Sequence, residues 1–166
     1  MATEGKNLSA YDARSLGEAK RLRIALVHSE WNQEITTALL KGGLDTLREL
    51  GLQEDNILVR GVPGSYELPL GAQWIAEHEN VDAIVAIGSV IQGETRHFEF
   101  VCQAVAQGIK DVSLKTGVPV IFCVLTDDTI DQARARSGGQ HGNKGVEAAV
   151  AAVRMASLKK QITKQG

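Results

Sequence analysis

From residue 23 onward, short apolar runs alternate with longer segments in which apolar residues recur at helical spacing. The apolar runs cover residues 23–28, 56–61, 82–88 and 118–126. They are too short to favour helices and are rich in β-branched residues, so we predict a strand at each. The run at 82–88 is apolar throughout, which is typical of a strand covered on both faces.

Each predicted strand is followed by a predicted helix. The first helix begins after Asn32, which we expect to cap it, and ends at Gly51. A second follows residues 63–67, and a third runs from Phe98 to a stop at Gly117. Residues 129–132 match a capping box and open a short helix that ends at 137–139. The last predicted helix spans about residues 145–159.

Four strand and helix units with continuous apolar strands predict an α/β fold, because right-handed crossovers place helices over both faces of a parallel sheet. We expect a three-layer αβα sandwich with a central four-stranded parallel sheet, formed by residues 23–158. Residues 1–22 are polar and without clear period, so we expect an N-terminal arm, either disordered or laid on a neighbouring subunit. There it could add a strand to the sheet. Residues 159–166 are expected to be a C-terminal tail.

Composition narrows the possible partners of the protein. A chain of 166 residues fits one domain, and its formal net charge of −2 lacks the basic excess of nucleic-acid or membrane-surface binders. We therefore expect small molecules or other protein chains as partners, with no nucleic acid and no membrane. Cys102 and Cys123 lie in apolar segments without metal-ligand spacing, which favours buried thiols in a reducing compartment. With no signal peptide or spanning segment in the sequence, we expect a cytoplasmic protein.

Ligands of open parallel sheets bind outside the carboxyl ends of the strands, which directs attention to the loops there. One of these loops contains Gly93, Glu94 and Thr95, between a buried strand and a helix N-terminus. Free backbone N–H groups and the helix dipole could bind a phosphate there. An ordinary connecting turn with Thr95 as N-cap is the alternative.

His97 falls in the first turn of the same helix. The positive end of the helix dipole should favour a neutral imidazole, which is suited to accepting a proton. A solvent-facing or structural histidine is the alternative.

The segment 63–67 combines a small-residue turn, an aromatic ring and a carboxylate. Its main chain and Glu67 could bind the hydroxyls of a polyol or sugar, whereas Tyr66 fits a packing role equally well. At the end of the first strand, Trp31 could stack on a planar ligand or fill a subunit contact.

The segment 136–145 offers two cations, Arg136 and Lys144, among glycines. It follows a helix and lacks the order of a phosphate-binding P-loop. Both cations could equally be ordinary surface charges.

Taken together, these motifs resemble one family. WN after the first strand, VPGSYELP, GSVIQGETRHFE, GVPVIF and RSGGQHGNKG occur in the order and spacing of lumazine synthases, with similarity from about residue 23 to about 158. The resemblance implies a flavodoxin-like fold. It also implies condensation of 5-amino-6-(D-ribitylamino)uracil with 3,4-dihydroxy-2-butanone 4-phosphate to 6,7-dimethyl-8-ribityllumazine, phosphate and water. This is the penultimate step of riboflavin biosynthesis and requires no cofactor and no metal.

The resemblance also implies a role for each matching residue. Substrates would be held by Trp31 and Asn32 at the pyrimidine, by Ser65, Tyr66 and Glu67 at the ribityl chain, by Ser89, Val90 and Ile91 at the pyrimidine edge, and by Gly93, Glu94 and Thr95 at the phosphate. His97 would transfer protons. Phe122, Arg136 and Lys144 would come from the adjacent subunit, with Arg136 at the phosphate and Lys144 near the heterocycle.

The resemblance leaves two points to be considered, the residue at position 31 and the state of assembly. The family more commonly has phenylalanine at the position of Trp31, and the wider ring should strengthen binding of riboflavin. Family members form pentamers, some of which assemble into shells of sixty chains, and the short connection at 137–141 leads us to expect the shell. Riboflavin synthase is a candidate partner.

The alternatives to this function are a non-catalytic flavin-binding or storage assembly on the same fold, and an unrelated nucleotide binder with a complete pocket in one chain.

Overall fold

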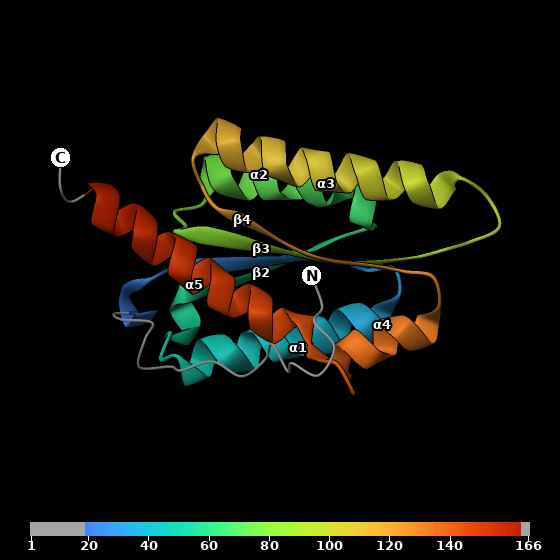
Figure 1. The fold of residues 1–166 in the computed structure, drawn as a ribbon. Helices are drawn as coiled ribbons and strands as arrows, with labels where there is room; N and C mark the ends of the chain where they lie inside the picture. The colour runs from blue at the N-terminus through green and yellow to red at the C-terminus, as the bar shows by residue number, and fades with distance from the viewer. Residues whose placement is uncertain (1–18, 164–166) are drawn as a thin grey trace.

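The computed structural model describes residues 19–163 and confirms the predicted three-layer α/β architecture (Figure 1). A parallel four-stranded sheet, with the order β2-β1-β3-β4, forms the middle layer. Helices α2 and α3 cover one face, and α1, α4 and α5 cover the other (Figure 1). This order places the two central strands, β1 and β3, side by side at the point where the chain changes direction across the sheet.

The four strands are β1 (Ile24–Ser29), β2 (Ile57–Val62), β3 (Ala83–Ile91) and β4 (Val120–Asp127). The predicted third strand ended at residue 88, but β3 continues for three more residues. Pairing with β4 supports this extension, with Ile91 opposite Asp127 and Gln92 N–H donating to the Asp127 carbonyl at 3.0 Å. Ser89, Val90 and Ile91 are therefore strand residues and not loop residues.

The helices lie close to their predicted positions. They are α1 (Gln33–Glu49), α2 (Leu68–His78), α3 (His97–Thr116), α4 (Ile130–Arg136) and α5 (Lys144–Thr163), with short 3₁₀ turns at Ala19–Arg21, Glu54–Asn56 and Ser65–Glu67. Helix α3 ends at Gly117, whose φ of 65° is a left-handed conformation that glycine adopts without strain. Helix α5 extends four residues beyond its predicted end at 159.

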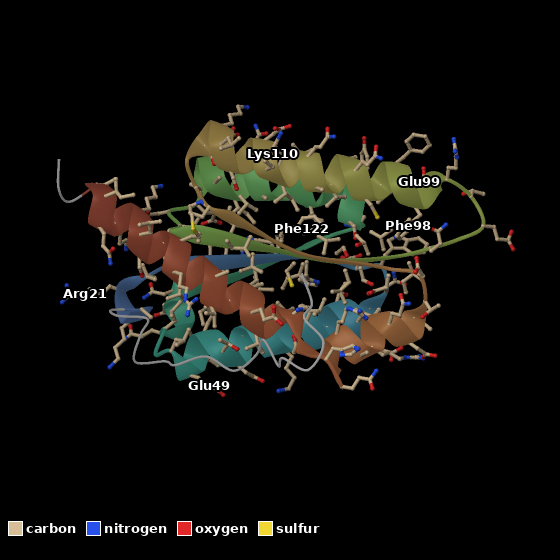
Figure 2. All side chains as sticks on the ribbon, in the orientation of Figure 1. Arg21, Glu49, Phe98, Glu99, Lys110 and Phe122 are labelled. Atoms are coloured by element: carbon tan, nitrogen blue, oxygen red, sulfur yellow. The ribbon has the colours of Figure 1, made fainter. Side chains whose placement is uncertain are left out.

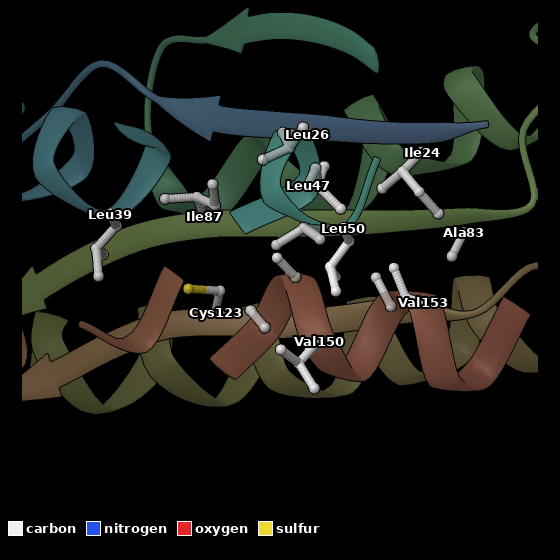
Figure 3. Packing of buried hydrophobic residues seen from close by; sticks show 14 of the residues in the cluster. Ile24, Leu26, Leu39, Leu47, Leu50, Ala83, Ile87, Cys123, Val150 and Val153 are labelled. Carbon is white, nitrogen blue, oxygen red and sulfur yellow. The ribbon is translucent and has the colours of Figure 1, made fainter. Parts of the chain in front are cut away.

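Two apolar layers hold the sandwich together. Alternate residues of β1 face opposite sides, so that Ile24 and Leu26 pack against α1 and α5, whereas Ala25 and Val27 pack against α2 and α3. Figure 3 shows part of the first layer, where Leu39 and Leu47 of α1 and Val153 of α5 pack against one face of the sheet. Burial of β3 on both faces explains its continuous apolar run.

Helices α1 and α5 pack closely where α5 begins. Gly145 is buried there, and an added Cβ would lie 2.8 Å from the Leu39 carbonyl carbon. The Asn143 side chain spans the same junction, because its Nδ2 donates to the Ala38 carbonyl at 2.9 Å and its Oδ1 accepts from Gly145 N–H at 2.8 Å. These contacts fix the first residue of α5, which is Lys144.

The structure corrects two predictions about helix caps. Asn32 occupies the N-cap position of α1, but its side chain does not cap the helix. In the capping box, Thr129 Oγ1 accepts from Gln132 N–H at 3.3 Å as expected. The return bond differs, since Gln132 Oε1 accepts from the N–H of Asp128, one residue before the cap, at 2.9 Å.

A small antiparallel hairpin was not predicted. Strands β5 (Ser137–Gly139) and β6 (Gly142–Asn143) pair on either side of a two-residue loop. The segment was predicted only as a helix end, although its glycines are typical of short hairpins.

The predicted arm, residues 1–22, falls largely outside the described residues, as does any strand that it could add to a neighbouring sheet. Of the predicted tail, residues 159–163 belong to α5, and 164–166 lie outside the described residues. In the described part of the chain, no helix is both long and apolar enough to cross a membrane.

Candidate functional site

A cavity of about 760 Å³ opens at the carboxyl ends of β1 and β3. These two strands are neighbours, and the chain leaves them toward helices on opposite faces of the sheet, α1 and α3 (Figure 1). Such a reversal splays the connecting loops apart and leaves a crevice, which is the usual ligand site of open α/β sheets. Its lining comes from the loop after β1, the turn before α2, the end of β3 and the start of α3.

The loop after β1 contributes Trp31 and Asn32. Asn32 has φ 55°, and among the described residues it is the only non-glycine residue with positive φ. Asparagine tolerates this conformation better than most residues, and here its Nδ2 donates to the Ser89 carbonyl at 2.8 Å. The left-handed turn and this bond fix the loop against β3. The adjacent Trp31 ring is 73% exposed, so its face is available to a planar ligand.

The turn before α2 contributes Ser65, Tyr66 and Glu67. Ser65 is buried, and its Oγ lies 3.5 Å from Ser29 Oγ, whereas the Tyr66 side chain is 62% exposed. Gly64 leaves room for the Glu67 carboxylate, because an added Cβ would lie 2.9 Å from Glu67 Oε2. The carboxylate therefore folds back over its own turn at the edge of the cavity, where it can accept hydrogen bonds.

The end of β3 forms the floor of the cavity through Ser89, Val90 and Ile91. Ser89 is 3% exposed, and its Oγ has no hydrogen-bond partner among the described residues. A buried hydroxyl beside a cavity can donate to or accept from a ligand at little further cost of desolvation.

His97 is the first residue of α3 and lines the cavity, as its predicted position implies. Its backbone N–H donates to Thr95 Oγ1 at 3.4 Å, so Thr95 interacts with the helix N-terminus although Arg96 is the capping residue. Gly93, Glu94 and Thr95 form an exposed turn next to the cavity and are not part of its lining. Within the described residues, no protein group accepts from their backbone N–H groups, which leaves these donors available to an anion.

Arg136 and Lys144 lie elsewhere in the chain. They line a second hollow, of about 470 Å³, at the end of the edge strand β4. Arg136 Nη1 donates to the Gln132 carbonyl at 2.9 Å and lies 3.6 Å from Asp127 Oδ1. Lys144 Nζ contacts both carboxylate oxygens of Glu147, at 2.8 and 3.0 Å.

Phe122 also lies outside the first cavity. Alternation along β4 places it on the face that α2 and α3 cover, as the labelled side chain in Figure 2 shows. It is nevertheless 43% exposed, because β4 is at the edge of the sheet. Phe122 is thus on the edge strand β4, and Arg136 and Lys144 line the hollow at the end of that strand.

The structure therefore divides the predicted site residues into three groups: those that line the cavity, the turn of Gly93, Glu94 and Thr95 beside it, and Phe122, Arg136 and Lys144 away from it. One cavity contains nine of them: Trp31, Asn32, Ser65, Tyr66, Glu67, Ser89, Val90, Ile91 and His97. Sequence reasoning missed Phe100 and Val101, which complete its lining. Both follow His97 at helical spacing of three and four residues, and that periodicity could have identified them.

Two ionisable side chains near the second hollow have shifted pKa values. Burial raises the pKa of the Asp127 carboxyl above its ordinary value. The positive charge of Arg136 lowers this pKa by a smaller amount, and the negative charge of Asp128 raises it further. Burial, together with the negative charge of Glu147, raises the pKa of the Cys123 thiol to about 12. In the described residues, no group of three or more His, Cys, Asp or Glu side chains could hold a metal ion.

A parallel αβα sandwich with a polar and aromatic cavity at its strand reversal, beside an exposed turn with free backbone N–H groups, is typical of α/β proteins that bind small molecules. The sequence model of the 6,7-dimethyl-8-ribityllumazine synthase family matches residues 21–160. The chain belongs to this family.

Curated relatives agree with this assignment. The 6,7-dimethyl-8-ribityllumazine synthase of Christiangramia forsetii is 57% identical over 161 residues, which cover 96% of each chain. The enzyme of the same name from Flavobacterium johnsoniae is 52% identical and covers 97% of this chain and 85% of the relative. That from Porphyromonas gingivalis is 51% identical, with 96% and 99% covered.

Proposed function

We propose that this protein condenses 5-amino-6-(D-ribitylamino)uracil with 3,4-dihydroxy-2-butanone 4-phosphate, giving 6,7-dimethyl-8-ribityllumazine, phosphate and water. The family match over residues 21–160 is the observation that carries this proposal. The reaction makes the protein a transferase in the penultimate step of riboflavin biosynthesis, acting in the cytoplasm. Nothing in the described residues favours a storage assembly without catalysis over this enzyme.

The cavity suits the uracil substrate. Trp31 would stack on the pyrimidine, while Asn32 and the polar groups of Ser89 to Ile91 would orient its edge. The turn at Ser65, Tyr66 and Glu67 would hold the ribityl hydroxyls, with the Glu67 carboxylate accepting hydrogen bonds. Holding two substrates in order should supply much of the rate enhancement.

The chemistry needs proton transfers and one leaving group. The 5-amino group attacks the ketone and water is lost to form an imine. Phosphate then leaves by elimination, and ring closure expels a second water. His97, at the cavity wall, would transfer protons. The open N–H groups of Gly93, Glu94 and Thr95 would bind the phosphate.

A complete site would require two subunits. The cavity lining contains the Glu67 carboxylate and no lysine or arginine, although a phosphate is best stabilised by cations. The adjacent subunit would supply them, with Arg136 at the phosphate, Lys144 near the heterocycle and Phe122 against the rings. The separation of these three residues from the cavity within one chain supports this arrangement.

Family members act as oligomers, and we propose a pentamer for this chain. We further favour a shell of sixty chains, in which riboflavin synthase would be a candidate partner. The short hairpin at β5 and β6, which adds no bulk to the connection, supports the shell. A sedimentation coefficient matching five chains would refute the shell but not the pentamer.

The shared site can be tested by subunit complementation. Trp31→Ala and Arg136→Ala proteins are each assayed with both substrates by lumazine absorbance, and are then dissociated, mixed in equal amounts and reassembled. In a random mixture, about a quarter of interfaces should combine an intact Trp31 with an intact Arg136 from the neighbour, so activity should return. A site contained in one chain would regain none.

The same assay tests individual roles. His97→Ala should lose activity modestly, because solvent can replace part of its proton transfer. Arg136→Ala should lose activity severely, because phosphate anchoring and departure both depend on a cation. Equal and small losses for both variants would contradict these roles.

A further inference from the structure

Asp127 is a buried carboxylate at the end of β4, in the hollow that Arg136 and Lys144 also line. It is the last residue of β4, and its side chain is 8% exposed. Its Oδ1 lies 3.6 Å from Arg136 Nη1, while its Oδ2 is buried without a hydrogen-bond partner among the described residues. Its backbone carbonyl meanwhile accepts from Gln92 N–H, just before the turn of Gly93.

This arrangement is unfavourable for stability alone. A carboxylate taken out of water needs several hydrogen bonds to recover its hydration, and one oxygen of Asp127 has none in the described part of the chain. Burial raises the pKa of the Asp127 carboxyl more than the Arg136 guanidinium lowers it. A local cost of this kind is typical of groups retained for function.

The contacts of Arg136 indicate that function. Asp127 and the Gln132 carbonyl both restrain Nη1, the latter at 2.9 Å. In the described residues, the structure records no protein partner for Nε or Nη2. Arginine binds phosphate through two parallel N–H groups, and the Nε and Nη2 pair provides one such fork.

The end of β4 and the helix α4 are also braced by a second contact, from Asp128 N–H to Gln132 Oε1 at 2.9 Å. The end of β4, which includes Asp127, is thus tied to α4 at two points. The Asp127 carboxylate can therefore restrict the guanidinium of Arg136. Asp128 itself is exposed and lacks this position.

We propose that Asp127 is a positioning residue for Arg136, restraining one nitrogen of the guanidinium so that its free edge is presented to the substrate phosphate. This inference rests on the proposed role of Arg136 as phosphate anchor. Asp127 does not touch the substrate and acts through Arg136.

Positioning and simple electrostatics predict opposite results for Asp127→Asn. Removing a negative charge beside Arg136 would strengthen anion binding if the carboxylate only competed with phosphate. Losing a restraint on the guanidinium would weaken anion binding, because the Arg136 side chain would then be freer before binding and would lose that freedom on binding.

The test measures inhibition by inorganic sulfate against the butanone phosphate in the assembled enzyme. Asp127→Asn should weaken sulfate inhibition and raise KM for the phosphate substrate by about 3- to 10-fold, with kcat within about twofold. The matched control, Asp128→Asn, should leave sulfate inhibition the same or slightly stronger. Unchanged or stronger inhibition in Asp127→Asn would overturn the proposal.

A double variant separates this inference from the function on which it rests. Asp127→Asn should have no further effect on sulfate inhibition in an Arg136→Ala background, because it acts through Arg136. An equal loss in both backgrounds would overturn the positioning role. If Arg136→Ala itself leaves sulfate inhibition unchanged, the proposed phosphate anchor fails instead.

The pH dependence gives a readout that a structural role would not change. The charged groups around Asp127 are Arg136 on α4, Asp128 beside it, and Lys144 with its partner Glu147 on α5. As pH falls and the Asp127 carboxyl is protonated, wild type should approach the weak sulfate binding of Asp127→Asn, so the ratio of their inhibition constants should converge to one. A ratio that stays constant with pH would contradict the proposal.

Folding of the variant provides the last check. The pKa of Asp127 is raised in the folded protein, so its charged form costs stability, and this cost appears as pH rises through that pKa. Asp127→Asn should therefore unfold at an equal or higher temperature at neutral pH. A lower unfolding temperature of Asp127→Asn with unchanged sulfate inhibition would show that the Asp127–Arg136 ion pair has a structural role, and would overturn the inference.

Discussion

Replacing Gly145 by alanine should destabilise the protein strongly, because α1 and α5 touch there through backbone. The added Cβ would lie 2.8 Å from the Leu39 carbonyl carbon and closer still to its oxygen. Neither atom belongs to a side chain, so no rotamer change relieves the overlap. One helix must retreat by about 1 Å, which opens gaps in a close-packed layer.

The magnitude follows from this overlap. Overpacking of a buried position costs 1–3 kcal/mol, and a contact against backbone belongs at the upper end, at about 3 kcal/mol. For a chain of this length, that cost lowers the unfolding temperature by about 6–12 °C. Lys144 precedes Gly145 in the chain, so the displaced helix start should also lower activity.

Urea unfolding followed by far-UV circular dichroism measures the effect. Wild type and variant must be compared at the same protomer concentrations, because assembly contributes to apparent stability. Gly61→Ala is the matched control, since its added Cβ would meet its nearest atom, Glu30 Oε1, at an ordinary 3.5 Å. A Gly145→Ala protein within about 0.5 kcal/mol of wild type would refute the packing argument.

Three further predictions concern the cavity and the core. Trp31→Ala should weaken riboflavin binding at least about tenfold in a fluorescence-quenching titration, because the stacking surface is lost. The control Trp74→Ala removes an exposed indole away from the cavity and should leave the quenching unchanged. Unchanged quenching in Trp31→Ala would refute stacking. Asn32→Ala should lower the free energy of unfolding by about 1 kcal/mol more than Asn32→Gly, because alanine is strained at φ 55° whereas both lose the bond to Ser89, and equal losses would contradict this. Cys123, with its pKa raised to about 12, should resist alkylation at pH 8 until the protein unfolds, and rapid labelling of the native protein would contradict its burial.

The sequence predicted the sheet well because its central strands are buried on both faces. A strand such as β3 must be apolar at every position, and that demand is visible without coordinates. The end of β3 was harder to predict, because Ser89 and the residues beyond it are held by pairing with β4, which is distant in sequence. Long-range pairing leaves no local signal in composition.

The candidate site was likewise predicted where local sequence decides the structure and missed where tertiary contacts decide it. Most of the residues predicted from loops at strand ends, Trp31 and Glu67 among them, line one cavity, since parallel strands end at the same edge. The side-chain bond of Asn32 was missed, because asparagine at a helix start is usually a cap and its left-handed backbone cannot be inferred from the sequence. The burial of Asp127 was also not predicted, because an acidic residue after a strand is usually exposed.

The cations Arg136 and Lys144 line a different hollow from the aromatic cavity, and this separation has a consequence for how the protein is made in the cell. A newly synthesised protomer would present the uracil-binding half on one part of its surface and the phosphate-binding half on another, and neither half alone could complete the reaction. Catalytic competence would then appear only when neighbours dock. A free protomer would be inactive, and activity would rise with each subunit interface that forms.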